Sequence, residues 1–532
     1  MRLSNLPRKT GFLAMLFTWA LATTMVAALA PQGAPQTPPP NYGQVPKPLD
    51  PSQVGDAGGR RGGGPGRGFF GRGRGRGGDP GAQIYNEQCL GCHGNSLSGG
   101  RAPSLLDDVW NIPNTDESLK NTILQGVSGT EMEGFEGVLT SEQVDSVIAY
   151  IRTRAKQAST VAARAPSPAN KVIQSEHGAF KIEVVADGLD TPWGVAELPD
   201  GRFLVTERGG TLRVVDHGKL LPPVEGTPKV WVKQDGGLFD VELHPHYSDP
   251  GNGWIYLSYS QPGPNDSSMT TIVRGHLRDN KWVDQQYLYN PPAAMYTTSN
   301  IHYGSRFTFD RQGHLFYSIG ERGDQNNAQD LTNPKGKVHR VNDDGTIPKD
   351  NPFVGQAGVD ESIWTYGHRN PQGFSWDPVT GELWEAEHGP TGGDEINIIK
   401  KGHDYGWPLV QYGTRQVGTE TGGPAWSGKY DNPVMFWTPT IAPSGIAFYT
   451  GNKFPAWKNN LLVTGLGGEA FRRLEIKKDK VAHEEILFSG FGRVRDVIIG
   501  HDGYPYILIQ VPGIALSDPN PGMLVRLVPV SK

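Results

Sequence analysis

The chain has 532 residues and a formal net charge of −5, so no global basic field favours binding to nucleic acid. Its 71 glycines and 43 prolines, with only 20% charged residues, indicate a turn-rich β protein with extended linkers and argue against a helical bundle. The only two cysteines are Cys89 and Cys92, which excludes a disulfide framework.

Residues 1–30 have the organisation of an export signal. Basic residues near the start precede an apolar run from Gly11 to Ala30, which ends in a small-residue cleavage site. That site favours a cleaved signal peptide over an uncleaved membrane anchor, although the run is nearly long enough to span a bilayer. We therefore expect a periplasmic or secreted protein, with membrane association as the alternative that the sequence leaves open.

Residues 31–80 are a low-complexity linker, Pro-rich in its first part and Gly/Arg-rich in its second. Such a segment cannot bury an apolar core, so it is expected to be extended or disordered. The Arg-Gly run would suit RNA, but export makes a solvated tether the better interpretation, and no nucleic-acid partner is expected. Weak contact of this basic run with an anionic membrane surface is a second interpretation.

Residues 81–155 contain Cys89-Leu90-Gly91-Cys92-His93, the C-x-x-C-H signature of covalently attached c-type haem. In this signature the two thiols bond the porphyrin, and His93 supplies one axial nitrogen to the iron. Met132 is the candidate for the second axial ligand, because thioether and imidazole ligation together raise the potential of an electron carrier. The alternatives are a core-filling methionine and, more weakly, a zinc site, which would need a second Cys pair.

A helix is predicted from Thr140 to Arg154, with Thr140 and Ser141 at its cap. Apolar residues recur along it at helical spacing, at Val144, Val147, Ile148 and Ile151. Together with the segment around Met132, this helix resembles the C-terminal part of class I cytochromes c. Residues 81–155 are therefore expected to form a small all-α cytochrome c domain, followed by an Ala/Pro/Ser-rich linker at 156–178.

Residues 179–532 contain six recurring units in which a Gly or Asn turn precedes an apolar, β-prone strand. The units begin at Pro199, Gly251, Arg311, Val379, Trp457 and His501. Their spacing is typical of propeller blades with variable loops. The sequence therefore predicts an all-β six-bladed β-propeller, in which loops from each blade meet at the mouth of a central channel.

Four groups of polar residues in this region are candidates for chemistry. His302 precedes a strand that leads to Glu321, and consecutive strand ends can bring this carboxylate beside the imidazole. That arrangement suits a general base, although a single loop histidine is more often structural. Arg369 and Asn370 offer several donors at one point, as a carboxylate or carbonyl ligand requires; the alternative is a purely structural Asn-Pro turn.

The third group lies between Glu387 and Tyr405 and includes Asp394 and Glu395, whose oxygens suit a hard cation such as Ca²⁺. The fourth group is Arg493 and Arg495, which face the same side of an alternating strand. Two cations on one face indicate an anionic ligand, and a solvated face is the alternative.

Residues from about 180 to 528 resemble the soluble pyrroloquinoline quinone (PQQ)-dependent sugar dehydrogenases, most closely their aldose sugar dehydrogenase branch. The resemblance rests on PWGVAELPDGRFLVTERGGTLRVV, GGLFDVELHP, GHRNPQG, EHGPTGGDEINIIKKGHDYGWP, WTPTIAPSGIAFYTG and RVRDV. It implies a six-bladed β-propeller, in agreement with the repeat count. His368 and His388 lie within these motifs but are the weaker histidine candidates.

The resemblance implies a role for each residue that matches a family motif. His302 matches the base that takes the proton from the sugar C1 hydroxyl while hydride passes to PQQ. Arg369 and Asn370 match residues that bind the PQQ quinone and stabilise charge on it. Glu321 stands where the family commonly has Asp as the partner of the base, and its extra methylene puts the geometry of that hydrogen bond in question.

Further contacts to PQQ are implied in the same way. Arg493 and Arg495 match the pair that holds the carboxylates of PQQ. A family Gln that touches PQQ aligns with Asp235, whose negative charge disfavours a tricarboxylate. Gln234, one residue earlier, is the alternative contact.

Two Ca²⁺ sites also follow from the resemblance. Gly389 and Pro390 match backbone carbonyls that share one ion with PQQ. Glu395 and Tyr405 match ligands of a second, structural ion.

The resemblance thus implies a PQQ- and Ca²⁺-dependent dehydrogenase that oxidises aldose sugars at C1 to lactones. Electrons would pass from PQQ to the haem and on to a respiratory acceptor such as another cytochrome. One alternative is a quinoprotein of the same fold that acts on other aldehydes or polyols, such as sorbosone-like substrates. Another is a non-catalytic propeller that serves as a binding module beside an electron carrier.

Overall fold

The structure is a computed structural model, and it describes residues 79–93, 97, 102, 105–106, 112–127, 132, 134–158, 167–390, 392–413, 429–511 and 521–530. The predicted signal at 1–30 lies outside the described residues, as do residues 31–78 of the first predicted linker and 159–166 of the second. Among the described residues, no helix is both long and apolar enough to cross a membrane. The limits of the predicted domains stay predictions.

The α-helices of the described residues precede the strands: α1 (Pro80–Gln88), α2 (Leu90–His93), α3 (Asp116–Gln125) and α4 (Ser141–Ala158). A capping box starts α4, in which Gln143 N donates to Thr140 Oγ1 (3.3 Å) and Thr140 N donates to Gln143 Oε1 (2.8 Å). The apolar face predicted for this helix is buried in one cluster with Tyr85 of α1 and Leu119 of α3. The helices therefore pack around a single apolar core, as expected of a small all-α fold.

Within the described part of the chain, the strands form six antiparallel sheets, one for each blade. Blade 1 contains β3 (Pro192–Glu197), β4 (Phe203–Glu207), β5 (Thr211–Asp216) and β6 (Lys219–Leu220). Blade 2 contains β7 (Leu238–Leu243), β8 (Ile255–Pro262), β9 (Ser268–Arg278) and β10 (Lys281–Tyr289). Blade 3 contains β11 (Phe307–Phe309), β12 (Leu315–Ile319), β13 (Lys337–Val341) and β14 (Ile363–Tyr366).

The remaining blades follow in chain order. Blade 4 contains β15 (Pro371–Trp376), β16 (Leu383–Glu387), β17 (Asp394–Ile399) and β18 (Met435–Trp437). Blade 5 contains β19 (Pro443–Phe448), β20 (Leu461–Gly465), β21 (Ala470–Ile476) and β22 (Val481–Ser489). Blade 6 contains β23 (Arg493–Ile499), β24 (Pro505–Gln510), β25 (Pro521–Pro529), β2 (Gly178–Asp190) and β1 (Val172–Ser175).

The predicted repeat units correspond to one structural position in every blade. Each unit forms the turn into the second strand of its blade, namely β4, β8, β12, β16, β20 and β24. Every one of these turns contains a residue with positive φ: Gly201, Gly253, Gly313, Gly381, Asn459 and Gly503. Gly and Asn adopt this left-handed conformation at the lowest cost, which explains why the turns were visible in the sequence. The predicted six-bladed β-propeller is confirmed.

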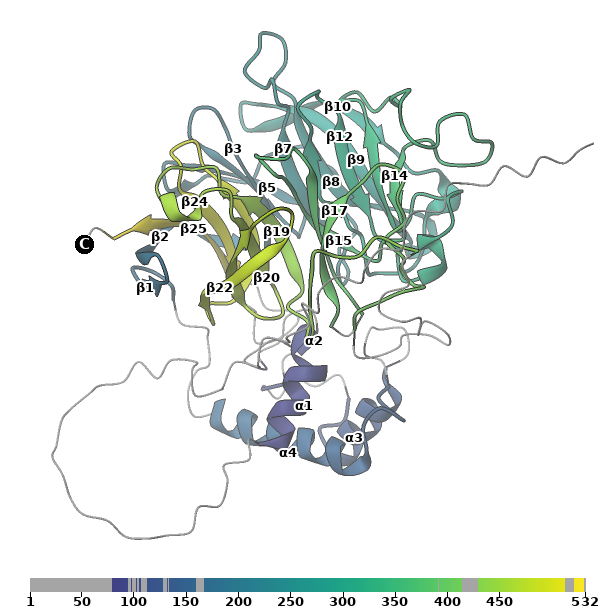
Figure 1. Ribbon diagram of the computed structural model, residues 1–532, viewed down its shortest axis with the longest axis vertical. Helices are drawn as coiled ribbons and strands as arrows, with labels where there is room; N and C mark the ends of the chain where they lie inside the picture. The colour runs from purple at the N-terminus through teal and green to yellow at the C-terminus, as the bar shows by residue number, and fades with distance from the viewer. Residues whose placement is uncertain are drawn as a thin grey trace, which may run out of the picture. The chain divides into compact units, whose positions relative to one another are not determined.

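The ring of blades is closed by strands from the two ends of the propeller sequence. In blade 6, β2 pairs with β25, so that Ile182 lies opposite Leu527. Figure 1 shows β2, drawn in blue, beside β24 and β25, drawn in yellow. Apolar layers then fill the space between neighbouring blades; Trp384 of blade 4, for example, meets Phe448 of blade 5 edge to face at 5.4 Å. These layers hold the first strands of the blades around the axis.

Candidate active site

The segments that lead into the first strands of the blades meet at one end of the propeller. The first strands, β3, β7, β11, β15, β19 and β23, contact one another in succession around the axis. A pocket of about 760 Å³ lies where their starts converge. It is lined by several of the predicted residues, namely Gln234, Asp235, Asn370, Arg493 and Arg495.

His302 and Glu321 are buried against each other beside this pocket. His302 Nδ1 lies 2.7 Å and 2.6 Å from the two carboxylate oxygens of Glu321, and His302 is only 3% exposed. The expected contact between consecutive strand ends is present, and the longer side chain of Glu accommodates it. His302 has φ of 52°, a left-handed conformation that costs a non-glycine residue about 1–2 kcal/mol. Strain of this kind is typical of functional sites.

The Glu321 carboxylate determines how the His302 imidazole can act. A carboxylate at Nδ1 favours the tautomer with the proton on Nδ1, which leaves the lone pair on Nε2. His302 N also donates to Asp235 Oδ2 at 3.4 Å, and Gly304 N donates to Asn370 Oδ1 at 3.0 Å. His302 is therefore bonded to one residue that lines the pocket, and Gly304, two residues later, is bonded to another.

The pocket is strongly electropositive because its lining contains the guanidinium groups of Arg208, Arg493 and Arg495. Burial, followed by repulsion from Arg493, Arg208 and Arg306, lowers the pKa of Arg495 well below its usual value. Asp235 opposes this effect, and Arg495 Nε has no hydrogen-bond partner among the described residues. The cluster of positive charge fits a ligand with several carboxylates.

Arg208 was not among the predicted residues. It follows β4 within the TERGG segment, and its guanidinium donates to the backbone oxygen of Gln234. Gln234 and Asp235 both line the pocket. Arg208 lies there too and places a positive charge near Asp235. The charged pair Glu207-Arg208 at the end of a second strand, followed by two glycines, was the signal that could have identified it.

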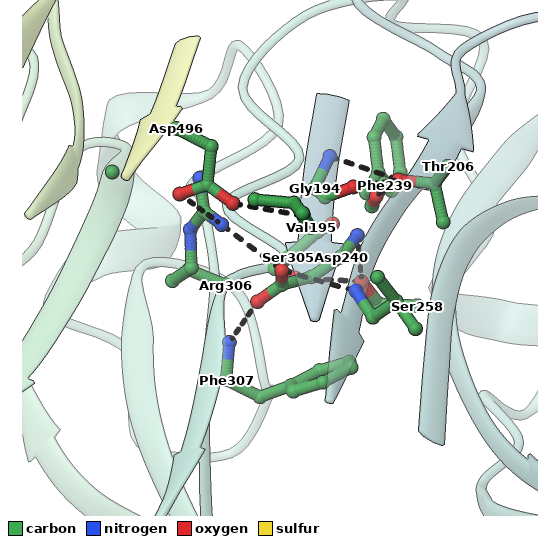
Figure 2. A network of polar contacts seen from close by, with 12 residues as sticks. Gly194, Val195, Thr206, Phe239, Asp240, Ser258, Ser305, Arg306, Phe307 and Asp496 are labelled. Carbon is green, nitrogen blue, oxygen red and sulfur yellow. Dashed lines mark hydrogen bonds and ion pairs between the residues drawn. The ribbon is translucent and has the colours of Figure 1, made fainter. Parts of the chain in front are cut away.

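A buried charged network lies next to the pocket (Figure 2). Arg306 Nη1 lies 2.9 Å from Asp240 Oδ1 and 3.1 Å from Asp496 Oδ1. Arg306 Nε donates to the backbone oxygen of Gln372, a pocket residue, at 2.9 Å, and Val195 N donates to Asp496 Oδ2 at 3.0 Å. One buried cation thus joins the first strands of several blades and supports the pocket.

The other predicted residues line a second, smaller pocket of about 290 Å³: Arg369, Gly389, Pro390, Glu395 and Tyr405. His388 lines both pockets, and its backbone oxygen accepts a hydrogen bond from Arg369 Nη1 at 3.4 Å. The Tyr405 hydroxyl donates to the backbone oxygen of Ile398. Only the backbone carbonyl of Tyr405 remains suited to the predicted cation.

Buried acidic side chains surround this second pocket. Burial, followed by repulsion from Glu387, raises the pKa of Glu395 to about 8, and burial also raises the pKa of Glu385. Oxygens of Glu385 and Glu387 and a ring nitrogen of His368 lie within 4.8 Å of one another. Glu385 Oε1 and Asn397 Oδ1 are buried without a hydrogen-bond partner among the described residues. The carboxylate and amide oxygens of this group fit a divalent cation with oxygen ligands.

Two conspicuous residues of this region have structural roles. His368 is fully buried, with Nδ1 2.8 Å from Glu387 Oε2 and Nε2 2.9 Å from Thr365 Oγ1. Asp394 faces away from Glu395 and accepts hydrogen bonds from the backbone nitrogens of Gly389 (2.9 Å) and Ala442 (2.8 Å). Asp394 therefore shapes the loop that presents the predicted carbonyl ligands.

The predicted haem residues lie in the helical part of the chain. Cys89 ends α1, and Cys92 and His93 lie on α2. Cys89 and Met132 both pack against the apolar cluster of these helices, an environment that suits a porphyrin. Burial, followed by the neighbouring Cys92, raises the pKa of the Cys89 thiol to about 12.

Comparison with known proteins gives two separate matches along the chain. Residues 189–516 match the family described as Glucose / Sorbosone dehydrogenase, and residues 77–151 match the family described as Cytochrome C oxidase, cbb3-type, subunit III. Aldose sugar dehydrogenase YliI of Escherichia coli (strain K12) is 40% identical over 356 residues, which cover 65% of this chain and 92% of that protein.

Solved structures agree with these sequence matches. The apo-form of the soluble aldose sugar dehydrogenase from Escherichia coli has a TM-score of 0.61 at 38% identity, over 66% of this chain and all of that one (100%). The PQQ-bound form of aldose sugar dehydrogenase from Streptomyces coelicolor has a TM-score of 0.55 at 27% identity, over 66% of this chain and 98% of that one.

Proposed function

We propose, from the premise that the chain belongs to the glucose/sorbosone dehydrogenase family, that it oxidises aldose sugars at C1 to lactones with PQQ and Ca²⁺. Electrons would pass to a haem c bound by Cys89, Cys92, His93 and Met132. The chain itself is an oxidoreductase of the soluble sugar dehydrogenase family that carries a cytochrome c-type domain. The cofactors, the substrate and the route of the electrons are the parts that we propose.

One observation carries this proposal: an electropositive pocket lies beside a buried His302–Glu321 pair. Arg493 and Arg495 would bind the carboxylates of PQQ, because bidentate guanidinium–carboxylate pairs are strong and directional. Arg208 would provide a third positive charge, which offsets the carboxylate of Asp235. This resolves the difficulty that an acidic residue poses in a site for a tricarboxylate.

His302 would act as the general base. With Nδ1 bound to Glu321, Nε2 would take the proton from the sugar C1 hydroxyl, and the carboxylate would stabilise the imidazolium that forms. General base catalysis of this kind contributes about 10²–10⁴ to a rate. The strained backbone at His302 and its contact with Asp235 would hold the ring in place before substrate binds.

The second pocket would complete the site. Bound PQQ would supply the oxidant that accepts hydride from C1, and Ca²⁺ would supply a Lewis acid at the quinone. Gly389 and Pro390 would present carbonyl oxygens to that ion, while Arg369 and Asn370 would donate hydrogen bonds where negative charge develops. Glu395 and the Tyr405 carbonyl would hold the second, structural Ca²⁺ beside Glu385.

The fused haem domain and the predicted signal support a place in respiration outside the cytoplasm. A haem on the same chain has a high effective concentration near the propeller, so it would accept electrons without a diffusing carrier. The next acceptor would be another cytochrome of the periplasm. This proposal requires attachment of haem to the C-x-x-C-H motif and export by the predicted signal, and the sequence contains a motif for each.

The proposal is tested by reconstitution. Purified protein loaded with PQQ and Ca²⁺ should convert glucose or other aldoses to lactones with a dye acceptor, and His302→Ala should remove this activity while PQQ still binds. A substrate panel with sorbosone-like aldehydes and polyols then decides the substrate class. Failure of the apo-protein to bind PQQ would favour the non-catalytic binding module.

A further inference from the structure

Lys337, at the start of β13, is a fully buried lysine that none of the roles above uses; its exposure is 0%. Its ammonium donates to three backbone oxygens, those of Asn327 (2.7 Å), Ala328 (3.1 Å) and Lys335 (2.7 Å). Three N–H donors thus meet three carbonyl acceptors, which is the complete hydrogen-bonding capacity of a charged amine.

The three carbonyls belong to the loop that connects β12 to β13. This loop, residues 320–336, contains Glu321 near its start and a short 3₁₀ turn at Gln325–Ala328. Lys337 binds the last two carbonyls of that turn, those of Asn327 and Ala328, and so adds a charged donor to the backbone donors that they already have. The loop therefore folds around the ammonium, as other loops fold around a bound metal ion.

Hydrogen bonds lead from this ammonium to both halves of the candidate site. Asn327 Nδ2 donates to the backbone oxygen of Glu321 at 3.0 Å, and Glu321 N donates to the backbone oxygen of Arg369 at 2.9 Å. Ala328 O, which Lys337 binds, also accepts from Gly367 N at 2.9 Å. The loop of Glu321 and the segment of Arg369 are thus held to the same cation.

The close approach of these two segments depends on Gly336. It has φ of +71°, and a Cβ atom there would lie 2.6 Å from Ala328 Cα and 2.8 Å from the backbone oxygen of His368. No other residue type fits this position. Gly336 therefore provides the space for the close approach of the two segments, and the adjacent Lys337 provides the charge that binds the loop.

We infer that Lys337 is an internal cation that positions Glu321 and Arg369, and through Glu321 the His302 base, for sugar oxidation. This inference rests on the proposed function, in which His302 and Glu321 act together. Lys337 touches neither substrate nor cofactor, so it is a positioning residue.

The charge of the amine is the specific requirement. Burial lowers the pKa of Lys337 to about 7, and the carboxylates of Asp330, Asp360 and Asp404 oppose that effect. A neutral amine has only two N–H donors for three carbonyls, so one buried carbonyl would lose its hydrogen bond to Lys337. An apolar side chain of the same length would leave all three without a partner from residue 337.

Two substitutions separate charge from packing. Lys337→Met keeps roughly the length of the side chain but removes its charge. Lys337→Ala leaves space in which an added amine can bind. We expect kcat to fall about 10–100-fold in both variants, with KM for sugar and the Kd of PQQ within about threefold of wild type. Propylammonium added to Lys337→Ala should raise the kcat of this variant at least tenfold, whereas propan-1-ol should not. Neither compound should change the kcat of Lys337→Met.

Lys400→Ala is the matched control, since Lys400 is an exposed lysine that pairs with Asp431 at the surface. It should keep wild-type kinetics and ignore propylammonium. Hydrogen exchange of residues 320–336 provides a second measurement that needs no turnover. We expect faster exchange in both Lys337 variants, and propylammonium should slow it again in Lys337→Ala.

Each outcome decides one of the two proposals. Wild-type kcat in Lys337→Met would overturn the role of the charge, as would loss of function in Lys337→Ala that propylammonium and propan-1-ol restore equally. Unchanged exchange in residues 320–336 would overturn the positioning of the loop. An inactive wild type would instead refute the proposed function, and the exchange data would still test Lys337.

Discussion

Replacing Arg495 with Met should weaken PQQ binding and at the same time stabilise the cofactor-free protein. In the pocket, the main charges that act on Arg495 are Arg493, Arg208 and Arg306, which repel it, and Asp235, which attracts it. It also stacks on the ring of Trp193 at 5.7 Å, so that contact is lost in the variant. The sign of the change in stability therefore depends on whether the lost repulsions outweigh the lost contacts with Asp235 and Trp193.

The repulsions outweigh the favourable contacts. At an effective dielectric constant of ~20, each pair of like charges in the pocket costs about 1–3 kcal/mol. Loss of the cation–π contact costs about 0.5–1 kcal/mol, and loss of the attraction to Asp235 offsets one of the three repulsions. A net gain of about 1–5 kcal/mol corresponds to a Tm that is higher by about 1–7 °C for a propeller of this size.

PQQ binding should change in the opposite direction. A hydrogen bond to a charged group contributes about 1.5–3 kcal/mol, so the Kd should rise by about 10–150-fold. Absorption titration of the apo-protein measures the Kd, and calorimetry without cofactor measures the Tm. A clear fall in the Tm of the apo-protein would refute the account of the pocket as an excess of positive charge.

Arg473 supplies the matched control in the same propeller. It is 1% exposed and is bound by Glu485 at 2.8 Å, so it is a buried arginine with a counter-charge. Arg473→Met should cost about 3–5 kcal/mol, because it leaves a buried carboxylate without its partner. The same substitution should therefore have opposite effects on Tm at positions 495 and 473.

Three further predictions follow from the described contacts. Glu321→Gln should lower kcat by about 10²–10³ with little change in KM, because the amide cannot stabilise the His302 imidazolium; steady-state kinetics within threefold of wild type would contradict this. In Ca²⁺-free protein, the Glu395 pKa of about 8 means that stability is full at acid pH and is lost as pH rises toward 8. Calorimetry should therefore show a Ca²⁺-dependent rise in Tm that grows from pH 6 to pH 8, and a constant rise would count against the site. Thr140→Ala removes the capping box with Gln143 and should cost the helical domain about 1 kcal/mol, measured by denaturant unfolding followed through the haem.

The fold could be predicted because its signals are local and repeated. Each blade needs a tight turn before its second strand, and a left-handed residue such as Gly201 or Asn459 marks that turn in the sequence. The capped helix that begins after Thr140 was predictable for a similar reason, since its cap and its apolar face lie within a few turns. The closing pair of β2 with β25 joins distant segments and has no local signal.

The candidate site could be predicted only in part. The contact of His302 with Glu321 joins the ends of consecutive strands, so chain order was sufficient to expect it. Arg208 and Gln372 reach the pocket from other blades, and their positions depend on the closure of the ring. Glu385 looks like an ordinary strand residue in the sequence, and only the packing of β16 against β17 reveals that it is buried beside Glu395.

The absorption spectrum of the haem during sugar addition tests the central claim most directly. With PQQ and Ca²⁺ bound, glucose or another accepted aldose should reduce the haem, and the same addition should leave it oxidised when PQQ is omitted or His302 is replaced by Ala. Haem reduction by sugar in the His302→Ala protein, or dye reduction by the wild type while its haem stays oxidised, would contradict a single path from sugar through the propeller to the haem.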